Sequence, residues 1–110
     1  MSKKCIAIGG PRAHATPDAT ASLMFAEIEA VWRNYSRGLI REIYERVDQR
    51  GVVMVYEALN RAEMERMLAS LPLAEAGFLD IQLIELKPFG LCQTLFRKPV
   101  AQVRGRLLRP

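Results

Sequence analysis

Apolar residues recur with strand and helix periods along the chain. Residues 3–9 (KKCIAIG) form a short apolar run without strict alternation, which predicts a strand covered on both faces. Thr16-Pro17-Asp18 is a typical helix start, since Thr16 can cap, Pro17 suits the first helical position and Asp18 favours the positive helix end. This helix is expected to run to about Arg37 and end at Gly38. Apolar residues three or four positions apart predict the face of this helix that points inward: Phe25, Ile28, Trp32, Tyr35 and Leu39.

The second half of the chain predicts a hairpin, a helix and a last strand. Residues 39–47 (LIREIYERV) and 52–58 (VVMVYEA) are rich in strand-forming residues and flank the turn DQRG. Asn60, with Glu63 three residues later, resembles a capping box at a helix start. Helical spacing follows at Met64, Met67, Leu68 and Leu71, and Pro72 blocks continuation. Residues 79–86 (LDIQLIEL) begin with apolar–polar alternation and predict a strand.

The order β-α-β-β-α-β predicts an α+β fold of the ferredoxin-like type with an antiparallel sheet. We expect one domain at residues 1–96 and a basic C-terminal extension at 97–110. Two helices cover one face of such a sheet. A second copy of the chain is the simplest cover for the other face, which predicts a symmetric homodimer that could assemble further.

The positive charge of the chain is concentrated at its C-terminus. From Arg97 onward there are five basic residues and no acidic ones, whereas all twelve acidic residues and the other eleven basic ones come earlier. A nucleic-acid-binding domain would carry a basic face among its ordered elements, so no nucleic-acid partner is expected. The extension could contact an acidic surface, RNA or anionic lipid. Leu107 and Leu108 favour the alternative that it covers a neighbouring subunit.

Cysteine usage and hydropathy indicate a cytoplasmic protein. Cys5 and Cys92 lie far apart and lack metal-ligand spacing, so neither a disulfide framework nor a zinc site is expected. No apolar run of signal-peptide length follows Lys3 and Lys4. No segment approaches the ~20 apolar residues of a membrane span, and no membrane partner is expected.

The segment LASLPLAEAGFLDIQLIELKPF carries a resemblance to a known family. Leu71-Pro72-Leu73 followed by Leu79-Asp80-Ile81 resembles the helix–LPL–strand segment of the muconolactone isomerase-like proteins, within the dimeric α/β-barrel superfamily. Likeness to a bacterial subgroup of small proteins of this type, mostly without assigned function, extends over residues 6–96. It includes Val31-Trp32, Tyr35, residues 38–44, residues 52–57 and Lys87-Pro88-Phe89.

This resemblance implies a ferredoxin-like monomer whose sheet pairs with a second copy to form a barrel. It implies proton transfer on a small anionic or aromatic-derived catabolite without metal or organic cofactor. Because one fold hosts many functions, two alternatives stay open. One is a non-catalytic dimeric barrel that binds a small ligand, with a sealed apolar pocket and outward salt-bridged glutamates. The other is a cofactor-free monooxygenase.

The hairpin holds the predicted catalytic residues. If Asp48 faces Gly51 across a tight turn, then Arg46 lies opposite Val53, Tyr44 opposite Val55 and Glu42 opposite Glu57. Two adjacent carboxylates repel, so one pKa should rise and the pair could exchange a proton near neutral pH. In this hypothesis Tyr44 is a donor and Arg46 anchors an anionic substrate. The alternative is that both glutamates form ordinary ion pairs with nearby basic residues, and a change in register would separate them.

The remaining predicted binding residues lie outside the hairpin. Trp32 and Tyr35 could line a substrate pocket, although aromatic residues at helical spacing more often belong to a core. His14 is the only histidine and lies four residues before Asp18, so the two could form a general-base dyad. The simpler interpretation is a solvated loop histidine and a first-turn helix acid.

Overall fold

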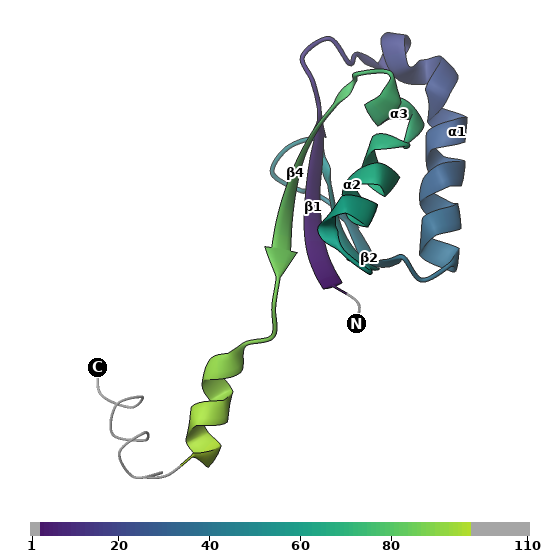
Figure 1. The fold of residues 1–110 in the computed structure, drawn as a ribbon. Helices are drawn as coiled ribbons and strands as arrows, with labels where there is room; N and C mark the ends of the chain where they lie inside the picture. Colours follow the sequence, from purple (N-terminus) through teal and green to yellow (C-terminus); the bar gives the residue numbers. More distant parts are fainter. Residues whose placement is uncertain (1–2, 98–110) are drawn as a thin grey trace.

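The computed structural model describes residues 3–97, so the predicted extension at 97–110 lies outside this range except for Arg97. The elements follow in the order β1 (Lys3–Pro11), α1 (Pro17–Ser36), β2 (Ile40–Glu45), β3 (Val52–Ala58), α2 (Arg61–Ala69), α3 (Pro72–Glu75), β4 (Leu79–Leu86) and the 3₁₀ helix η1 (Gly90–Phe96). The four strands form one antiparallel sheet in the order β2-β3-β1-β4. The helices α1, α2 and α3 lie on one face of the sheet (Figure 1). The predicted ferredoxin-like α+β fold is therefore confirmed.

The helix starts are those that the sequence predicts. The Thr16 hydroxyl accepts a hydrogen bond from the Ala19 N–H (3.2 Å), and Pro17 occupies the first helical turn. The Asn60 side chain accepts from the Glu63 N–H (2.9 Å) at the start of α2. The Glu63 carboxylate in turn accepts from the Leu59 N–H (3.3 Å). These bonds satisfy backbone donors that a helix start leaves without partners.

Pro72 ends one helix and begins another. The backbone turns after α2, and Pro72 then occupies the first turn of the short helix α3, where its fixed φ angle suits the helix and its missing N–H is not needed. Leu71 and Leu73 are both buried on either side of Pro72. This segment places the Leu73 N–H beneath α1, where it becomes part of the site described below.

The core lies between the helices and one face of the sheet. It is formed by alternate strand residues and by helix residues that pack on them: Cys5, Ala7, Ile40, Met54, Tyr56, Ala58, Met64, Leu68 and Leu71. The opposite face, called the open face here, carries an apolar centre of partly exposed side chains: Ile6, Ile8, Val53, Val55, Ile84 and Leu86. No helix of the described residues covers this open face (Figure 1).

The orientation predicted for α1 is wrong. The buried residues of this helix are Thr20 and Glu27, whereas Phe25 and Trp32 are 80% and 63% exposed. We define the α1 stripe as the exposed residues Met24, Phe25, Ile28, Trp32 and Tyr35. Periodicity identified an apolar face correctly, but most of that face points away from the sheet. Thr20 and Glu27 face a cavity between α1 and the sheet, and Met24 and Ile28 reach that cavity from the edge of the stripe.

The register predicted for the hairpin is also wrong. Tyr44 pairs with Val53 and Glu42 with Val55, and the pairing shifts at a bulge between Ile40 and Glu42. The connection is wider than a four-residue turn, since the Arg46 N–H bonds the Gly51 carbonyl (2.9 Å).

Two contacts explain the wider connection. The Arg46 side chain binds Asp48 inside the loop through two hydrogen bonds of 3.0 and 2.7 Å. Gly51 adopts φ 155°, and a Cβ atom there would lie 2.7 Å from the Gly9 carbonyl oxygen. The loop therefore packs directly on β1 at a position that only glycine fits.

The chain leaves the folded body after β4. Residues 87–97, called the arm here, extend away from the sheet and carry η1 (Figure 1). No residue of η1 is buried. In the range 3–97, no helix is long and apolar enough to cross a membrane.

Candidate functional site

A cavity of about 410 Å³ separates α1 from the sheet. Its walls are mainly apolar, and α1, β3 and α3 each contribute to them; they include Met24, Ile28, Val31, Met54 and Leu73. Ile28 lines the cavity and is also 61% exposed, so the cavity opens toward the α1 stripe. A volume of this size is typical of small-molecule sites.

Glu27 places a buried carboxyl group in this cavity. It lies in the middle of α1 and is only 8% exposed. Its Oε1 atom accepts a hydrogen bond from the Leu73 N–H (2.9 Å), in the first turn of α3. Its Oε2 atom makes no hydrogen bond with the described part of the chain. One carboxyl oxygen is thus fixed by the backbone, and the other can accept a hydrogen bond from solvent or from a ligand.

Burial raises the pKa of Glu27, and the hydrogen bond from Leu73 opposes this shift in part. Desolvation favours the neutral form of a carboxyl group, whereas a bond from an N–H favours the ionised form. A carboxyl group balanced in this way can both donate and accept a proton closer to neutral pH than an exposed glutamate. Glu27 therefore has the position and the chemistry of a general acid or base.

Tyr56 adds a second buried polar group near Glu27. Its ring is fully buried on β3, and burial raises the pKa of its hydroxyl to about 12. Asn34 lowers this pKa and the charge of Glu27 raises it, so both side chains lie near the hydroxyl. The hydroxyl makes no hydrogen bond of ordinary geometry within residues 3–97. Tyr56 is therefore neutral at physiological pH and does not serve as a base.

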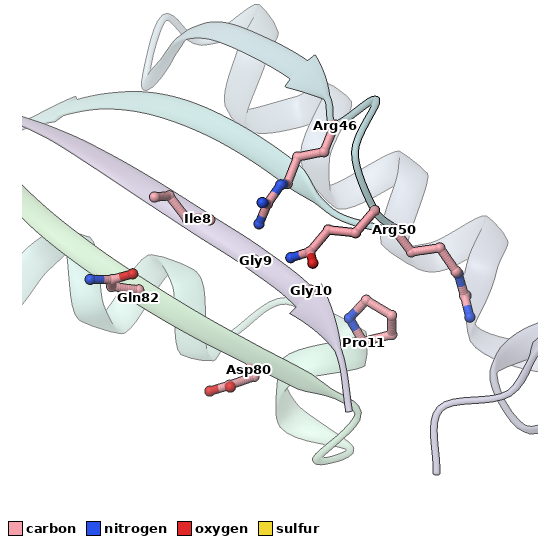
Figure 2. A pocket seen from close by; sticks show the side chains of 9 residues that line it. Ile8, Gly9, Gly10, Pro11, Arg46, Arg50, Asp80 and Gln82 are labelled. Atoms are coloured by element: carbon pink, nitrogen blue, oxygen red, sulfur yellow. The ribbon is translucent and has the colours of Figure 1, made fainter. Parts of the chain in front are cut away.

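A second pocket, of about 510 Å³, lies at one end of the open face. Figure 2 shows Arg46 above the β1 segment from Ile8 to Gly10, with Asp80 and Gln82 on β4. This pocket is more polar and more open than the cavity under α1. The guanidinium group of Arg46 already binds Asp48 and lowers the pKa of that carboxyl group. Arg46 is thus committed to the loop in the isolated subunit.

Of the three predicted catalytic residues, the structure joins Tyr44 and Glu42 by a hydrogen bond, whereas Glu57 pairs with Arg41. The Tyr44 hydroxyl donates to Glu42 Oε1 (2.7 Å), and this bond raises the pKa of Tyr44. Glu57 Oε2 binds Arg41 Nε at 2.7 Å. Glu42 and Glu57 are not opposed across the hairpin. Glu42 pairs with Val55, and the backbone N–H of Glu57 donates to the Leu39 carbonyl. The hypothesis of a proton-sharing pair rested on the wrong register and loses its geometric basis.

The predicted binding residues also lie outside the cavity. Trp32 and Tyr35 are exposed on α1, with ring centroids 5.8 Å apart. His14 is exposed and packs on Phe78, with centroids 5.4 Å apart. Phe78 lines the cavity, so His14 lies behind one of its walls. His14 makes no hydrogen bond to Asp18 in the described residues, and the proposed dyad is not formed.

Glu27 is the candidate site residue that sequence reasoning missed. It belongs to a second helical pattern, Thr20, Glu27, Val31 and Asn34, whose members lie on the inward side of α1. Within residues 3–97, no group of three or more His, Cys, Asp or Glu side chains could hold a metal ion.

Comparisons with known proteins identify the fold. No protein-family model and no curated protein matches the sequence. The structure matches 5-chloro-2-hydroxyhydroquinone dehydrochlorinase (TftG) from Burkholderia phenoliruptrix AC1100 in complex with 2,5-dihydroxybenzoquinone. The match has a TM-score of 0.63 and 13% identity and covers 76% of this chain and 93% of that chain. It also matches Rv0793 from Mycobacterium tuberculosis, with a TM-score of 0.50 and 18% identity, over 81% of this chain and 96% of that chain. At these identities the likeness is one of fold.

Proposed function

We propose that this protein is a small cofactor-independent enzyme that transfers a proton on a small aromatic-derived or anionic catabolite. The proposal rests mainly on Glu27, a buried carboxyl group with one free oxygen in a mostly apolar cavity. A carboxyl group is costly to bury, and in a structural role it would be expected to form more than one hydrogen bond. A role in proton transfer explains both its burial and its free oxygen.

The reaction needs only groups of this chain. In its ionised form Glu27 removes a proton from a hydroxyl or an activated carbon of the ligand. In its protonated form it returns that proton to another atom, so that a double bond moves and no net oxidation occurs. The Leu73 N–H holds Oε1 and keeps the carboxyl group oriented during both steps. The mostly apolar walls lower the local polarity around the carboxyl group and so strengthen these interactions. Neither a metal ion nor an organic cofactor is required.

The class of ligand follows from the cavity and from the structural neighbour. Its volume of about 410 Å³ and its apolar walls suit a flat molecule of one ring. TftG was solved with 2,5-dihydroxybenzoquinone, a hydroxylated quinone of this kind. Such a compound has acidic hydroxyl groups, and its double bonds change position when a proton moves from one atom to another. A buried general acid or base acts on these features.

The open face supports a homodimer. Its centre is apolar and its rim carries Glu42, Tyr44 and Arg46, as in an interface with a hydrophobic core and a polar rim. Pairing two open faces would bury the apolar centre and form a closed barrel from two sheets. Tyr44 and Arg46 would then lie at this interface. If Arg46 anchors a substrate, it would do so at the edge of the pocket in Figure 2, which it lines.

Turnover of a compound panel tests this proposal. Hydroxylated quinones and unsaturated lactones are incubated with the protein in the presence of a chelator, and their absorbance and dissolved oxygen are followed. We expect conversion without oxygen uptake, and a fall of about 10²–10⁴-fold in Glu27→Gln. Glu29→Gln, exposed on the same helix, is the matched control and should retain full activity. Equal activity of Glu27→Gln would contradict the proposal, and oxygen uptake would indicate a monooxygenase instead.

A non-catalytic ligand-binding protein is the second candidate. It is favoured by the ion pair between Arg41 and Glu57, in which the arginine side chain is 55% exposed, and by the mostly apolar walls of the cavity. This candidate predicts saturable binding of the same compounds without turnover. Glu27→Gln would then bind as tightly as the wild type, because a neutral amide fits the site at least as well as a carboxyl group.

A further inference from the structure

The floor of the pocket in Figure 2 carries no side chain at its centre. Gly10 follows Ile8 on the open face of β1 and pairs with Asp80 of β4. On its other side Gly10 lies against Gly51, whose carbonyl accepts the hydrogen bond from the Arg46 N–H. Arg46 and Asp80 are thus the two ends of a row whose middle positions are glycines. Neighbouring strands lie ~4.8 Å apart, so the Cα atoms at the two ends are separated by about 14 Å, with a trough between them.

Packing explains one of these glycines but not the other. Gly51 must be glycine, because a Cβ atom there would lie 2.7 Å from the Gly9 carbonyl oxygen. A Cβ atom on Gly10 would meet nothing closer than the Arg50 carbonyl oxygen at 3.5 Å, and Gly10 does not adopt a positive φ angle. Glycine weakens a strand, and it often marks a place where a ligand approaches the backbone closely. Gly10 therefore indicates that the trough is kept open for a ligand.

The two walls of the trough carry opposite charges. On the wall formed by the β2–β3 loop, Arg46 is paired with Asp48, whereas the Arg50 guanidinium makes no ion pair with any residue from 3 to 97. On the β4 wall, Asp80 forms neither an ion pair nor a side-chain hydrogen bond within the same range. The pocket thus offers a ligand one cation and one carboxylate, on opposite walls.

A third side of the pocket is apolar. Ile8 borders the pocket toward the apolar centre of the open face, and its partner Gln82 extends the β4 wall. A ligand that reaches both charged walls therefore rests its remaining part on Ile8. The volume of about 510 Å³ is in the range of small-molecule sites. If two open faces pair through their apolar centres, this pocket lies at the end of the barrel beside the β2–β3 loop.

We propose that this pocket binds an α-amino acid with an apolar side chain, at a site separate from the proposed proton transfer. The carboxylate of the ligand faces Arg50, its ammonium group faces Asp80, and its side chain lies on Ile8. Charge-assisted hydrogen bonds are stronger than neutral ones, and a ligand that lacks either charge leaves one wall without a partner. Arg50 also borders the cavity under α1, whereas Asp80 borders only the pocket, so changes at Asp80 separate the two sites.

Titration of L-leucine into the purified protein, followed by calorimetry and by backbone amide NMR signals, tests this proposal. Two analogues serve as controls, since L-leucinamide lacks the carboxylate and 4-methylpentanoate lacks the ammonium group. We expect saturable binding of L-leucine that shifts the amide signals of Gly10 and Gln82. Each analogue should bind about 10–100-fold more weakly, because each loses one hydrogen bond between charged groups.

Three variants locate the binding. Asp80→Asn removes the charge of the β4 wall at nearly constant size and should weaken L-leucine binding about 10–100-fold. Glu85→Gln, on the same strand but outside the pocket, is the matched control and should bind like the wild type. Gly10→Val fills the trough and should abolish binding, since the backbone leaves room for its Cβ atom.

The proposal is overturned if L-leucine does not bind at concentrations up to about 10 mM, as when a second subunit fills the pocket. Equal binding of either analogue, or equal affinity of Asp80→Asn, also overturns it, and so do signal shifts confined to the cavity around Glu27. Asp80→Asn should keep full turnover of the quinones and lactones named above. Failure of the amino-acid site therefore leaves the proposed chemistry standing, and failure of that chemistry leaves the site standing.

Discussion

The bond between Glu27 and Leu73 makes a quantitative prediction about stability. Glu27→Ala removes the acceptor of a buried N–H, and an unsatisfied buried donor destabilises by about 1–3 kcal/mol. Alanine returns at most ~0.7 kcal/mol through its higher helix propensity. Glu27→Gln keeps an oxygen at the same position and is the matched control. With that return at its full value, Glu27→Ala should be less stable than Glu27→Gln by about 0.3–2.3 kcal/mol.

Urea denaturation followed by circular dichroism at pH 7 measures this difference. For a domain of this size it corresponds to a fall in Tm of about 1–18 °C, at roughly 4–8 °C per kcal/mol. Equal stability of the two variants would refute the reasoning, because it would mean that the Leu73 N–H finds another partner or that the bond contributes nothing. The slope of the urea transition should be unchanged in both.

Three further predictions follow from buried and capping groups. The pKa of Glu27 is raised in the folded protein, so the native state binds more protons than the unfolded state at pH values between the two pKa values. The free energy of unfolding of the wild type should therefore fall as pH rises from the ordinary glutamate range through the folded pKa. Glu27→Gln should lack this component of the pH dependence, which unfolding free energies measured from pH 3 to 8 will show. The Tyr56 hydroxyl is buried without an ordinary hydrogen bond, so Tyr56→Phe should be as stable as the wild type or more so in thermal unfolding; a loss above 1 kcal/mol would reveal a partner for the hydroxyl. Asn60→Ala should destabilise by about 1 kcal/mol through loss of the α2 cap, and an unchanged urea midpoint would contradict this.

Local signals in the sequence were sufficient to predict the elements and their order. The helix caps at Thr16 and Asn60 and the strand at Leu79–Leu86 are present as expected. These features depend on interactions within a few residues, which the sequence displays directly. The antiparallel sheet then follows from the order of elements, since few arrangements connect them without crossings.

The orientation of α1 could not be predicted in the same way. Periodicity shows that Phe25, Ile28 and Trp32 share a face, but not whether that face meets the sheet of its own subunit or another surface. The inward face of α1 borders a cavity, where close packing is not required and Thr20 and Glu27 are tolerated. The rule that the apolar face of a helix packs on its own core therefore fails for α1, whose inward face borders a cavity and whose apolar face is largely exposed.

The hairpin shows a second limit. Its faces were predicted correctly, because a shift of two residues preserves the alternation of side chains. The pairing of Glu42 and Glu57 depended on the exact turn, which the Arg46–Asp48 bonds and the packing of Gly51 on Gly9 widen. The contact between Gly51 and Gly9 joins the loop to β1, over forty residues away in the sequence, and no local pattern encodes it. For the same reason the contact between Glu27 and Leu73 was not visible in the sequence.

Hydrogen–deuterium exchange into the ligand would most directly test whether Glu27 moves a proton inside the cavity. A hydroxylated quinone is incubated in deuterated buffer, and the loss of its ring-hydrogen signals is followed by NMR with wild-type protein, Glu27→Gln and Glu29→Gln. We predict that wild type and Glu29→Gln accelerate exchange and that Glu27→Gln is slower by about 10²–10⁴-fold. A ligand that binds saturably but exchanges no faster than in buffer, or exchanges equally with Glu27→Gln, would contradict the proposed role of Glu27.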